Sequence, residues 1–517
     1  MRICIISREY PPETGWGGIA TFAKHLSHGL TDLGHQVEVI SEAVGEPKST
    51  RDAAGIWVHR VKPTEVGAGL KKGGVLLSYS KYVLTTSTAL WNKFLEIHKE
   101  RPFDVVDSPE LLAESLWAGV SKAVPLTVRL YTPHSKFIAE RLHNVRPNLD
   151  HQLVAGLERV AMLSADVITS PSDDLADFVS IDLNYPRERI KIVRNPIDAE
   201  VFTPVGPQAI PTDGRKTVMF VGRLEERKGI HYLIDAIPTI VKQHKNVRFV
   251  IIGDDTKTAA GQTSVLAELQ ERVQENGAGS YIEWINRVTL DSLPSYYRSA
   301  DICVVPSVYD NSPYTCLEAM SCGRAVVGTS AGGTREYMVH DESGIIVPPR
   351  DAQSLATAII GLLNDDKRRI QIANNARARV ITHFQRKEIA RQTVELYKEA
   401  IETFAKRADY KLYRRDPSLL YGDVDEFLTA WDQSIYDLLY LDPVFRTVHY
   451  FNLLRKRPKL AIAKAIRSVI AKAFGKKANK WAIVQKLDAS IQAKHQTPQE
   501  LAAAADADKK EKQLVAR

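Results

Sequence analysis

Residues 218–229 of the chain read VMFVGRLEERKG. The first four residues are apolar, and glycines at 222 and 229 bound the loop that follows. From there, apolar side chains recur at the spacing of a helix face: Ile230, Leu233, Ile234 and Ile237. A buried strand, a glycine-bounded loop and a helix in this order are typical of an α/β domain with a mostly parallel sheet.

The same alternation runs through the chain on both sides of this stretch. The strand-like runs of the first half are 2–7, 37–41, 56–61, 104–107, 126–131, 166–170 and 190–193, and those of the second are 218–221, 247–252, 281–285, 302–305, 325–328 and 345–347. Residues 203–216 hold three prolines and two glycines without periodicity, which indicates a linker. From 351 to about 406 the pattern is helical.

This organisation predicts two doubly wound, Rossmann-like α/β domains, at 1–202 and 203–384, followed by a helical basic extension over 407–517. Ligands of such sheets bind beyond the carboxyl ends of the strands. We therefore expect the site in the cleft where the two domains face each other.

The composition excludes several classes of protein. A chain of 517 residues that is 44% hydrophobic and 25% charged is neither wholly disordered nor fibrous. No run reaches the roughly 18 to 20 apolar residues of a membrane span, and the apolar start at 1–7 is too short for a signal peptide. The four cysteines form no CxxC pair and have no histidine at zinc spacing. We expect a cytoplasmic protein without a metal site.

The positive charge is concentrated in residues 453–487. This segment has 11 Lys and Arg residues and no Asp or Glu, whereas the whole chain has a net charge of +7, so the rest sums to −4. Its apolar residues fall on one helical face: Ile462, Ile466, Val469, Ile470 and Phe474. The pattern is typical of a basic amphipathic helix on an anionic membrane surface, which would place the protein peripherally on the inner face. Packing on the protein's own body, or another partner, are the alternatives. Nucleic acid is not expected, because no recognition motif accompanies the charge.

Two loops carry residues suited to an anionic ligand. In the loop quoted above, Arg223 offers a planar fork of donors and Lys228 a point charge, as a diphosphate requires; as an isolated pair they could equally be solvated loop charges. The loop at 9–18 (EYPPETGWGG) ends in Gly17 and Gly18 before a helix, whose first N–H groups can meet an anion. Alone, this loop could be a simple turn.

A third segment, 306–320 (PSVYDNSPYTCLEAM), passes from a strand through a loop into a helix. Asp310 in the loop and Glu318 in the first turn of the helix can both face the cleft and accept hydrogen bonds from sugar hydroxyls. Backbone N–H groups at Tyr314, Thr315 and Cys316 can meet a phosphate. The alternative for Glu318 is that it only complements the helix dipole.

Taken together, these segments resemble retaining glycosyltransferases of the GT-B architecture, specifically the large family 4. That family has a GG loop after the first strand, a G-R-x(4)-K-G segment that opens the second domain, and an E-x(7)-E element. Here they stand as Gly17-Gly18, Gly222-Arg223…Lys228-Gly229 and Asp310-x(7)-Glu318. Residues 193–198 (VRNPID), 299–301 (SAD) and 331–336 (AGGTRE) match in order, and the resemblance spans about residues 1–405.

The resemblance implies a role for each matching position. Arg223 and Lys228 would hold the donor's diphosphate, Glu318 the ribose and Asp310 the donor sugar, although the family more often has Glu at that place. Gly17 and Gly18 would approach the phosphates or the acceptor, and His134 would lie near the sugar. The stretch with Asn286 and Val288 would cradle the base through backbone groups. A helix at about 385–406 would pack back on the first domain.

The function implied is that of a hexosyltransferase-type enzyme. It would move a sugar from a UDP- or GDP-linked donor to a glycan or lipid-linked acceptor, with retention and without cofactor or metal. Cations and helix N-termini would stabilise the charge that develops on the leaving diphosphate, and no residue is assigned as catalytic base. A GT-B sugar-nucleotide epimerase, or a non-catalytic GT-B protein acting through its basic tail, are the alternatives.

Overall fold

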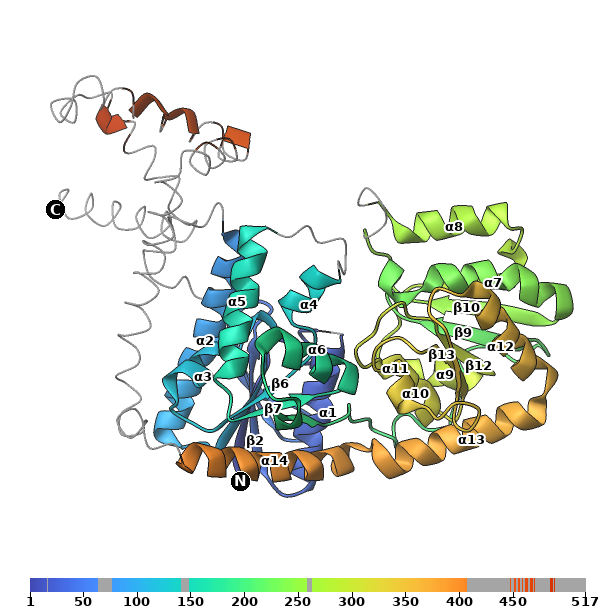
Figure 1. Ribbon diagram of the computed structural model, residues 1–517, viewed down its shortest axis with the longest axis horizontal. Helices are drawn as coiled ribbons and strands as arrows, with labels where there is room; N and C mark the ends of the chain where they lie inside the picture. Colours follow the sequence, from blue (N-terminus) through green and yellow to red (C-terminus); the bar gives the residue numbers. More distant parts are fainter. Residues whose placement is uncertain are drawn as a thin grey trace, which may run out of the picture. The chain divides into compact units, whose positions relative to one another are not determined.

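The computed structural model describes residues 1–15, 17–63, 77–140, 148–257 and 263–406, and single residues and short runs between 447 and 488 (Figure 1). Residues 1–63 and 79–406 belong to one compact unit, and the described residues from 447 onward belong to another. Each unit is described by itself.

The first domain is built on an eight-stranded sheet in the order β3-β4-β2-β1-β5-β6-β7-β8. Its strands are β1 (Arg2–Ile6), β2 (Gln36–Glu42), β3 (Lys48–Arg51), β4 (Trp57–Val61), β5 (Val105–Pro109), β6 (Leu126–Arg129), β7 (Val167–Ser170) and β8 (Ile190–Ile192). All pairs are parallel except β3 with β4. The edge strand β3 was not expected, because all four of its residues are exposed and polar and carry no apolar signal.

Among the described residues, the helices that accompany this sheet are α1 (Gly18–Asp32), α2 (Ser78–Glu100), α3 (Leu116–Ser121), α4 (His134–Ala139), α5 (Leu149–Leu163) and α6 (Asp173–Leu183). Two of them begin at side-chain caps. Asn148 accepts a hydrogen bond from the His151 N–H at the start of α5, and Ser172 accepts one from the Leu175 N–H at the start of α6. Such caps satisfy N–H groups that a helix leaves without an internal partner.

The second domain contains a six-stranded, fully parallel sheet in the order β11-β10-β9-β12-β13-β14. Its strands are β9 (Lys216–Val221), β10 (Val247–Ile252), β11 (Ile282–Ile285), β12 (Ile302–Val305), β13 (Ala325–Thr329) and β14 (Ile345–Val347). Its helices are α7 (Ile230–Gln243), α8 (Val265–Glu275), α9 (Leu293–Ser299), α10 (Tyr314–Ser321), α11 (Thr334–Tyr337), α12 (Ala352–Asn364) and α13 (Asp366–His383).

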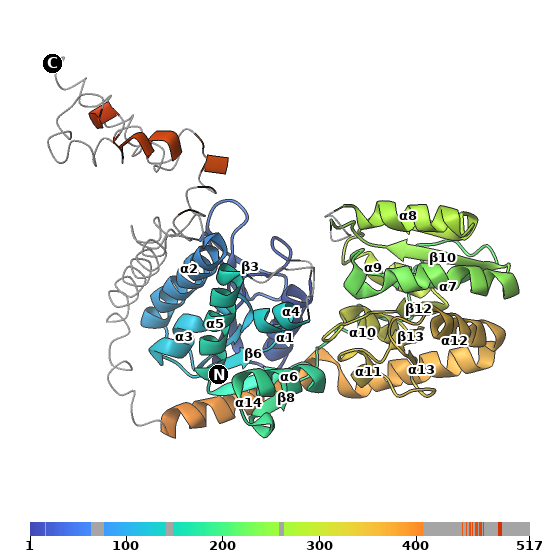
Figure 2. The same ribbon diagram turned by 45° about the horizontal axis from the view of Figure 1, so that its top comes forward.

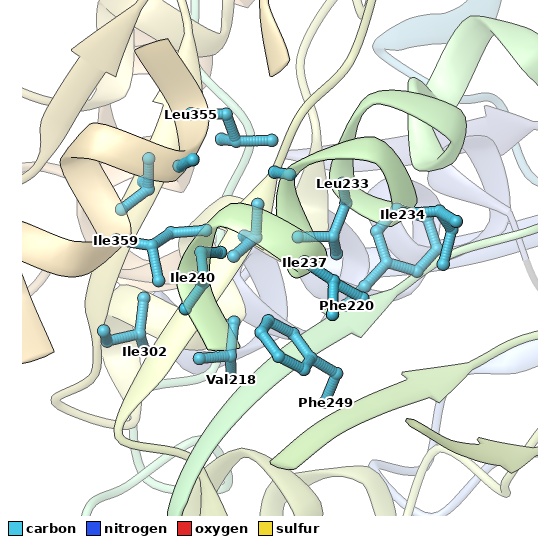
Figure 3. Packing of buried hydrophobic residues seen from close by; sticks show 14 of the residues in the cluster. Val218, Phe220, Leu233, Ile234, Ile237, Ile240, Phe249, Ile302, Leu355 and Ile359 are labelled. Atoms are coloured by element: carbon cyan, nitrogen blue, oxygen red, sulfur yellow. The ribbon is translucent and has the colours of Figure 1, made fainter. Parts of the chain in front are cut away.

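Helices cover both faces of the second sheet, so its strands are apolar on both sides (Figure 2). Along β9, Val218 and Phe220 enter a cluster with α7, α8 and α12, whereas Met219 enters a second cluster with α9, α10 and α13. Figure 3 shows Phe220 and Val218 beneath Ile237 and Ile240 of α7. This burial explains why the quoted stretch opens with four consecutive apolar residues.

The helical pattern from 351 to 406 forms three successive helices. Asp365 caps α13 by accepting the Arg368 N–H, and the chain breaks again at Phe384. There the Ile197 N–H donates to the Phe384 carbonyl, and the Arg386 N–H donates to the Ile197 carbonyl. These bonds fix the crossing back to the first domain.

The last of these helices, α14 (Arg386–Lys406), packs on the first domain (Figure 1). Its Tyr397 hydroxyl donates to Asp107 Oδ2 at 2.7 Å. Gly29 of α1 permits the close approach, because a Cβ there would lie 2.6 Å from the Arg386 carbonyl oxygen. Helix α14 thus contacts both α1 and β5 of the first domain.

The described residues between 447 and 488 are helical. Phe451, Leu454, Ile462, Ile466 and Val469 are 44–69% exposed. Arg467 donates to Asp488 at 2.8 Å within this part. Most of the basic residues of 453–487, together with Ile470, Phe474 and the chain end, lie outside the described residues.

A membrane-spanning helix and a metal-binding cluster are both absent from the residues that the structure describes. None of the helices in that part of the chain is long and apolar enough to cross a membrane. Among the same residues there is no group of three or more His, Cys, Asp or Glu side chains that could hold a metal ion.

Candidate functional site

Each sheet has one place where the strand order reverses direction. In the second sheet it lies between β9 and β12, and in the first between β1 and β5. Loops leaving two such neighbouring strands run to opposite sides of the sheet and open a crevice at the carboxyl ends. The loops after β9 and β12 are 222–229 and 306–313, which are two of the three segments singled out from the sequence.

Glycines hold the loop after β9 close to its neighbours. Gly229 has φ +68°, and a Cβ at this position would lie 1.8 Å from the Pro306 carbonyl oxygen. A Cβ at Gly253 would lie equally close to the Gly222 carbonyl oxygen. A side chain at either position would push the loops apart, so the glycines are required for the short 3₁₀ turn Glu226–Lys228 to reach the second loop.

A cavity of about 290 Å³ lies at this crevice. Its lining comes from the loop after β9, the loop and helix after β12, the segment after β11, and the N-terminus of α1 in the first domain. The residues that carry the argument are Gly17, Gly18, Arg223, Lys228, Asp310 and Glu318. The cavity is thus formed by both domains of the first unit.

The centre of the site is a buried ion pair. Lys228 Nζ lies 2.5 Å from Asp310 Oδ2, and Arg227 lies 3.5 Å from the other carboxylate oxygen. Burial by itself would raise the pKa of Asp310, but the charges of Lys228 and Arg227 outweigh it and hold the pKa below its ordinary value. Asp310 is therefore a carboxylate, fixed in place as an acceptor for hydroxyl groups.

Arg223 is placed differently from Lys228. Its side chain is 59% exposed at the cavity and lies 3.0 Å from buried Glu225, which also holds Arg227 at 3.2 Å. Because Glu225 also pairs with Arg227, the exposed guanidinium of Arg223 can turn toward an incoming phosphate without leaving Glu225 unpaired. Arg223 is thus placed to meet a ligand and has little role in the core.

Glu318 is a buried carboxyl group with one hydrogen-bond donor. The Tyr297 hydroxyl donates to Glu318 Oε2 at 2.8 Å. Burial raises the pKa of Glu318 to about 7, despite this bond and the charge of Lys228. The group is consequently poised between its two protonation states near neutral pH, and it has oxygens available to hydroxyl groups.

Two helix N-termini meet at the cavity. Helix α10 starts after Pro313 and α1 after Gly17, and neither residue supplies a side-chain cap. A Cβ on Gly18 would lie 3.7 Å from the ring of Tyr314, so the two termini are in contact distance. Uncapped N–H groups and the positive ends of two helices are a suitable environment for phosphates.

The structure brings most of the sequence-predicted residues to this cavity. Its lining includes Gly17, Gly18, Arg223, Lys228, Val288, Asp310, Tyr314, Thr315 and Glu318. Three other predicted residues do not line the cavity: Asn286, His134 and Cys316. Asn286 is exposed beyond the end of β11. The Cys316 side chain is buried in the second core cluster, where it contacts Met320 Sδ at 3.7 Å.

His134 opens helix α4 in the first domain. Its ring lies 5.1 Å from that of His151 and 5.2 Å from that of Tyr79, while its backbone N–H donates to Glu158. Burial, with the nearby His151, lowers the pKa of His134 to about 4. The side chain is therefore a neutral imidazole, and it is not among the residues that line the cavity.

The sequence analysis missed several residues of the site. Arg227 stands in the quoted loop next to Lys228, and its position in the same turn was an available signal. Tyr297, which binds Glu318, precedes the segment 306–320, and no sequence pattern pointed to it. Asn311 stands beside Asp310, and its role is apparent only from its contacts in the first domain, described below.

Two facing doubly wound domains, with cations, a fixed carboxylate and two helix N-termini at their shared cavity, are the architecture of a GT-B glycosyltransferase. Solved structures agree on the fold. Sucrose-phosphate synthase from Thermosynechococcus elongatus has a TM-score of 0.62 and 22% identity, covering 78% of this chain and all of that one. HepE from Anabaena in complex with UDP has a TM-score of 0.57 and 19% identity, covering 77% and 100%.

Comparison with family models and relatives identifies the family. Residues 207–379 match glycosyl transferases group 1, and residues 16–201 match glycosyltransferase family 4. An uncharacterized glycosyltransferase, MJ1607 of Methanocaldococcus jannaschii, is 28% identical over 423 residues, 78% of this chain and 99% of the relative. D-inositol 3-phosphate glycosyltransferase of Corynebacterium urealyticum is 27% identical, covering 77% and 95%. The chain belongs to the GT-B glycosyltransferases of this group 1 and family 4 type, whose donors are nucleotide sugars.

Proposed function

We propose that the protein transfers a hexose from a UDP- or GDP-linked donor to a glycan or lipid-linked acceptor, with retention of the anomeric configuration and without a metal or cofactor. The observation that carries this proposal is the grouping of Arg223, Lys228, Asp310 and Glu318 with two helix N-termini at one cavity. A solved complex of HepE with UDP-glucose, at 20% identity, supports a nucleotide-sugar donor.

The roles follow from the chemistry of each group. The exposed guanidinium of Arg223 and the ammonium of Lys228 neutralise the diphosphate, on which negative charge grows as the sugar–phosphate bond breaks. Asp310 accepts hydrogen bonds from donor-sugar hydroxyls, and Glu318 from the ribose. Because the cations and the helix N-termini are already in place, little reorganisation accompanies bond cleavage. The acceptor attacks from the face that the leaving group occupies, and no residue is assigned as its base.

A donor screen tests the proposal. The full chain is incubated with UDP- and GDP-linked glucose, N-acetylglucosamine and mannose, with and without EDTA, and products are followed by mass spectrometry and NMR. Transfer with an unchanged anomeric configuration and no effect of EDTA is the expected result. A product epimer without transfer would indicate an epimerase, loss of activity in EDTA would contradict metal independence, and no turnover with any donor would favour a non-catalytic role.

We further propose that residues 453–487 bind an anionic membrane surface, which would suit a lipid-linked acceptor. The segment has 11 basic residues and no acidic one, and its described apolar residues Ile462, Ile466 and Val469 are 44–65% exposed. Each basic group near such a surface contributes about 1 kcal/mol. An exposed apolar face on a basic helix favours a lipid surface over an aqueous environment.

Vesicle co-sedimentation of the full chain tests this second proposal. We expect binding to vesicles of phosphatidylcholine with phosphatidylglycerol and little binding to phosphatidylcholine alone. Ile466→Asp should weaken the binding, whereas Val160→Asp, at an exposed apolar residue of α5, should not. Equal binding of Ile466→Asp and wild type, or no binding to anionic vesicles, would contradict the membrane proposal.

A further inference from the structure

Residues 309–312, in the loop after β12, contact both domains. Asp310 bonds Lys228 within the second domain, whereas Tyr309, Asn311 and Ser312 reach into the first. The Tyr309 hydroxyl donates to Asp174 Oδ2 at 3.1 Å. The Ser312 carbonyl accepts from the Asn195 side-chain amide at 3.0 Å. The segment that positions the sugar-binding carboxylate is thus also a contact between domains.

Of these residues, Asn311 binds the first domain through both polar atoms of its side chain. Its side chain is only 7% exposed, and both ends of its amide are used. Oδ1 accepts from the Ser172 hydroxyl at 2.6 Å, and Nδ2 donates to the Tyr131 carbonyl. Both partners belong to the first domain, where Tyr131 follows β6 and Ser172 follows β7.

The partners of Asn311 are themselves fixed. The Ser172 hydroxyl, besides donating to Asn311, accepts the Leu175 N–H as the cap of α6. The Tyr131 N–H donates to both oxygens of buried Glu110. Asn311 therefore binds two anchored points of the first domain, and a movement of either domain is transmitted to its backbone.

Close packing prevents Asn311 from moving independently of Asp310. The Gly333 N–H donates to the Asp310 carbonyl at 3.0 Å. A Cβ on Gly333 would lie 2.0 Å from the Asn311 carbonyl oxygen and 2.8 Å from Ser172 Cβ. The loop, Gly333 and the cap of α6 are in direct contact, with no room for a side chain between them.

We propose that Asn311 is a positioning residue that couples closure of the two domains to the placement of Asp310 on the donor sugar. This inference rests on the proposed transferase function. Most residues that line the cavity belong to the second domain, so we expect the nucleotide to bind whether or not the domains are closed. Asp310 takes its productive place only when Asn311 engages Ser172 and Tyr131. Asn311 thus affects turnover and not nucleotide affinity.

The test compares Asn311→Ala with Asn246→Ala. Asn246 is a matched control, because its side-chain amide also donates to a carbonyl, that of Gly214, at an exposed site where β10 begins. For Asn311→Ala we expect transfer kcat to fall about 10- to 100-fold, as for other small misplacements of reacting groups. The Kd for UDP, or for GDP if the donor screen selects it, should stay within about twofold in calorimetry. Asn246→Ala should change neither quantity.

Ser172→Ala removes the same hydrogen bond from the other domain. Its effect on kcat should have the same direction, and the double variant should lose less than the combined effect of the two single variants. Additive losses, an unchanged kcat in Asn311→Ala, or parallel losses of kcat and nucleotide affinity would each overturn the proposal.

Hydrogen exchange separates this inference from the proposed function. In the absence of any donor, Asn311→Ala should speed exchange in segment 309–313 and also at the Leu175 amide in the first domain. Faster exchange in one domain alone would overturn the coupling. If the wild type turns over no donor, the transferase proposal fails, and exchange still decides whether Asn311 couples the domains.

Discussion

The two switch points of this molecule hold their carboxyl groups in opposite states. At the second sheet, Asp310 is paired with Lys228 and Arg227, and its pKa is held below the ordinary value. At the first sheet, Glu110 is fully buried and accepts mainly backbone N–H bonds, and burial raises its pKa to about 8. A carboxyl group that follows a parallel strand is thus ionised in the second domain and protonated in the first.

The difference shows where the protein has placed its charge. Glu158, also fully buried, binds the N–H groups of Leu112 and His134, and burial raises its pKa well above the ordinary value. Glu110 and Glu158 are neutral, and the first-domain residues that line the cavity, Gly17, Gly18 and Thr21, carry no charge. The second domain supplies the cations that a diphosphate needs.

Lys228→Ala should give the largest loss. It removes a cation from the diphosphate site and leaves Asp310 buried with Arg227 alone, so kcat/KM should fall about 10³-fold. Lys216→Ala is the control, because Lys216 stands where β9 begins and pairs with Asp366 at 3.1 Å, at the opposite end of the same strand. Steady-state kinetics measure both variants. A Lys228→Ala enzyme within about threefold of wild type would contradict the role of this cation.

Arg223→Ala should cost about 100-fold in kcat/KM with little change in the thermal unfolding midpoint. Its side chain is exposed, and its buried partner Glu225 also pairs with Arg227, so the fold does not depend on Arg223. Kinetics and a thermal melt of the same preparation give the two quantities. Near-normal turnover in a folded Arg223→Ala protein would remove the residue from the proposed site.

Nucleotide affinity should depend on Glu318 and on pH. Because burial raises the pKa of Glu318 to about 7, the carboxylate fraction grows as the pH rises from 6 to 8. A carboxylate accepts ribose hydroxyls more strongly than the acid does, so affinity should rise about tenfold over this range. Glu318→Gln should remove the part of the pH dependence that exceeds the titration of the nucleotide itself. Parallel pH curves for wild type and variant, in calorimetry, would contradict the ribose contact.

Glu110 should make the protein less stable as the pH rises. Its folded pKa of about 8 lies above the unfolded value, so the folded state binds the extra proton between about pH 4.5 and 8. The contribution of Glu110 to the free energy of unfolding is fully present below pH 4.5 and is lost as the pH rises to about 8. Glu110→Gln, which keeps an acceptor for the Tyr131 N–H, should flatten that decline in thermal unfolding midpoints. An equally steep decline in the variant would assign the effect to other groups.

The sequence predicted the fold well and the site in part. Runs such as 247–252 and 302–305 match β10 and β12, because strands buried on both faces are continuously apolar. Motif order located Arg223, Lys228, Asp310 and Glu318. Spacing along the chain carries no information on contacts between domains, so Asn311 with Ser172 could not be foreseen. The helix expected from about 385 begins at Arg386, but the bonds to Ile197 that hold the break at Phe384 could not be foreseen, for the same reason.

Asn286→Ala should have the smallest effect on activity. It tests whether the family motif or the cavity lining identifies the residues that contact the base. The family resemblance placed Asn286 with Val288 at the nucleotide base, but only Val288 lines the cavity, and Asn286 is exposed. If the base is held through backbone groups, the Asn286 side chain is dispensable, and the donor KM should change less than about twofold. Val288→Asp, at the cavity wall, should raise the same KM strongly, because it places a carboxylate beside the base. A large KM increase in Asn286→Ala would mean that this segment moves onto the donor when it binds, and that the cavity takes its final form only with the donor present.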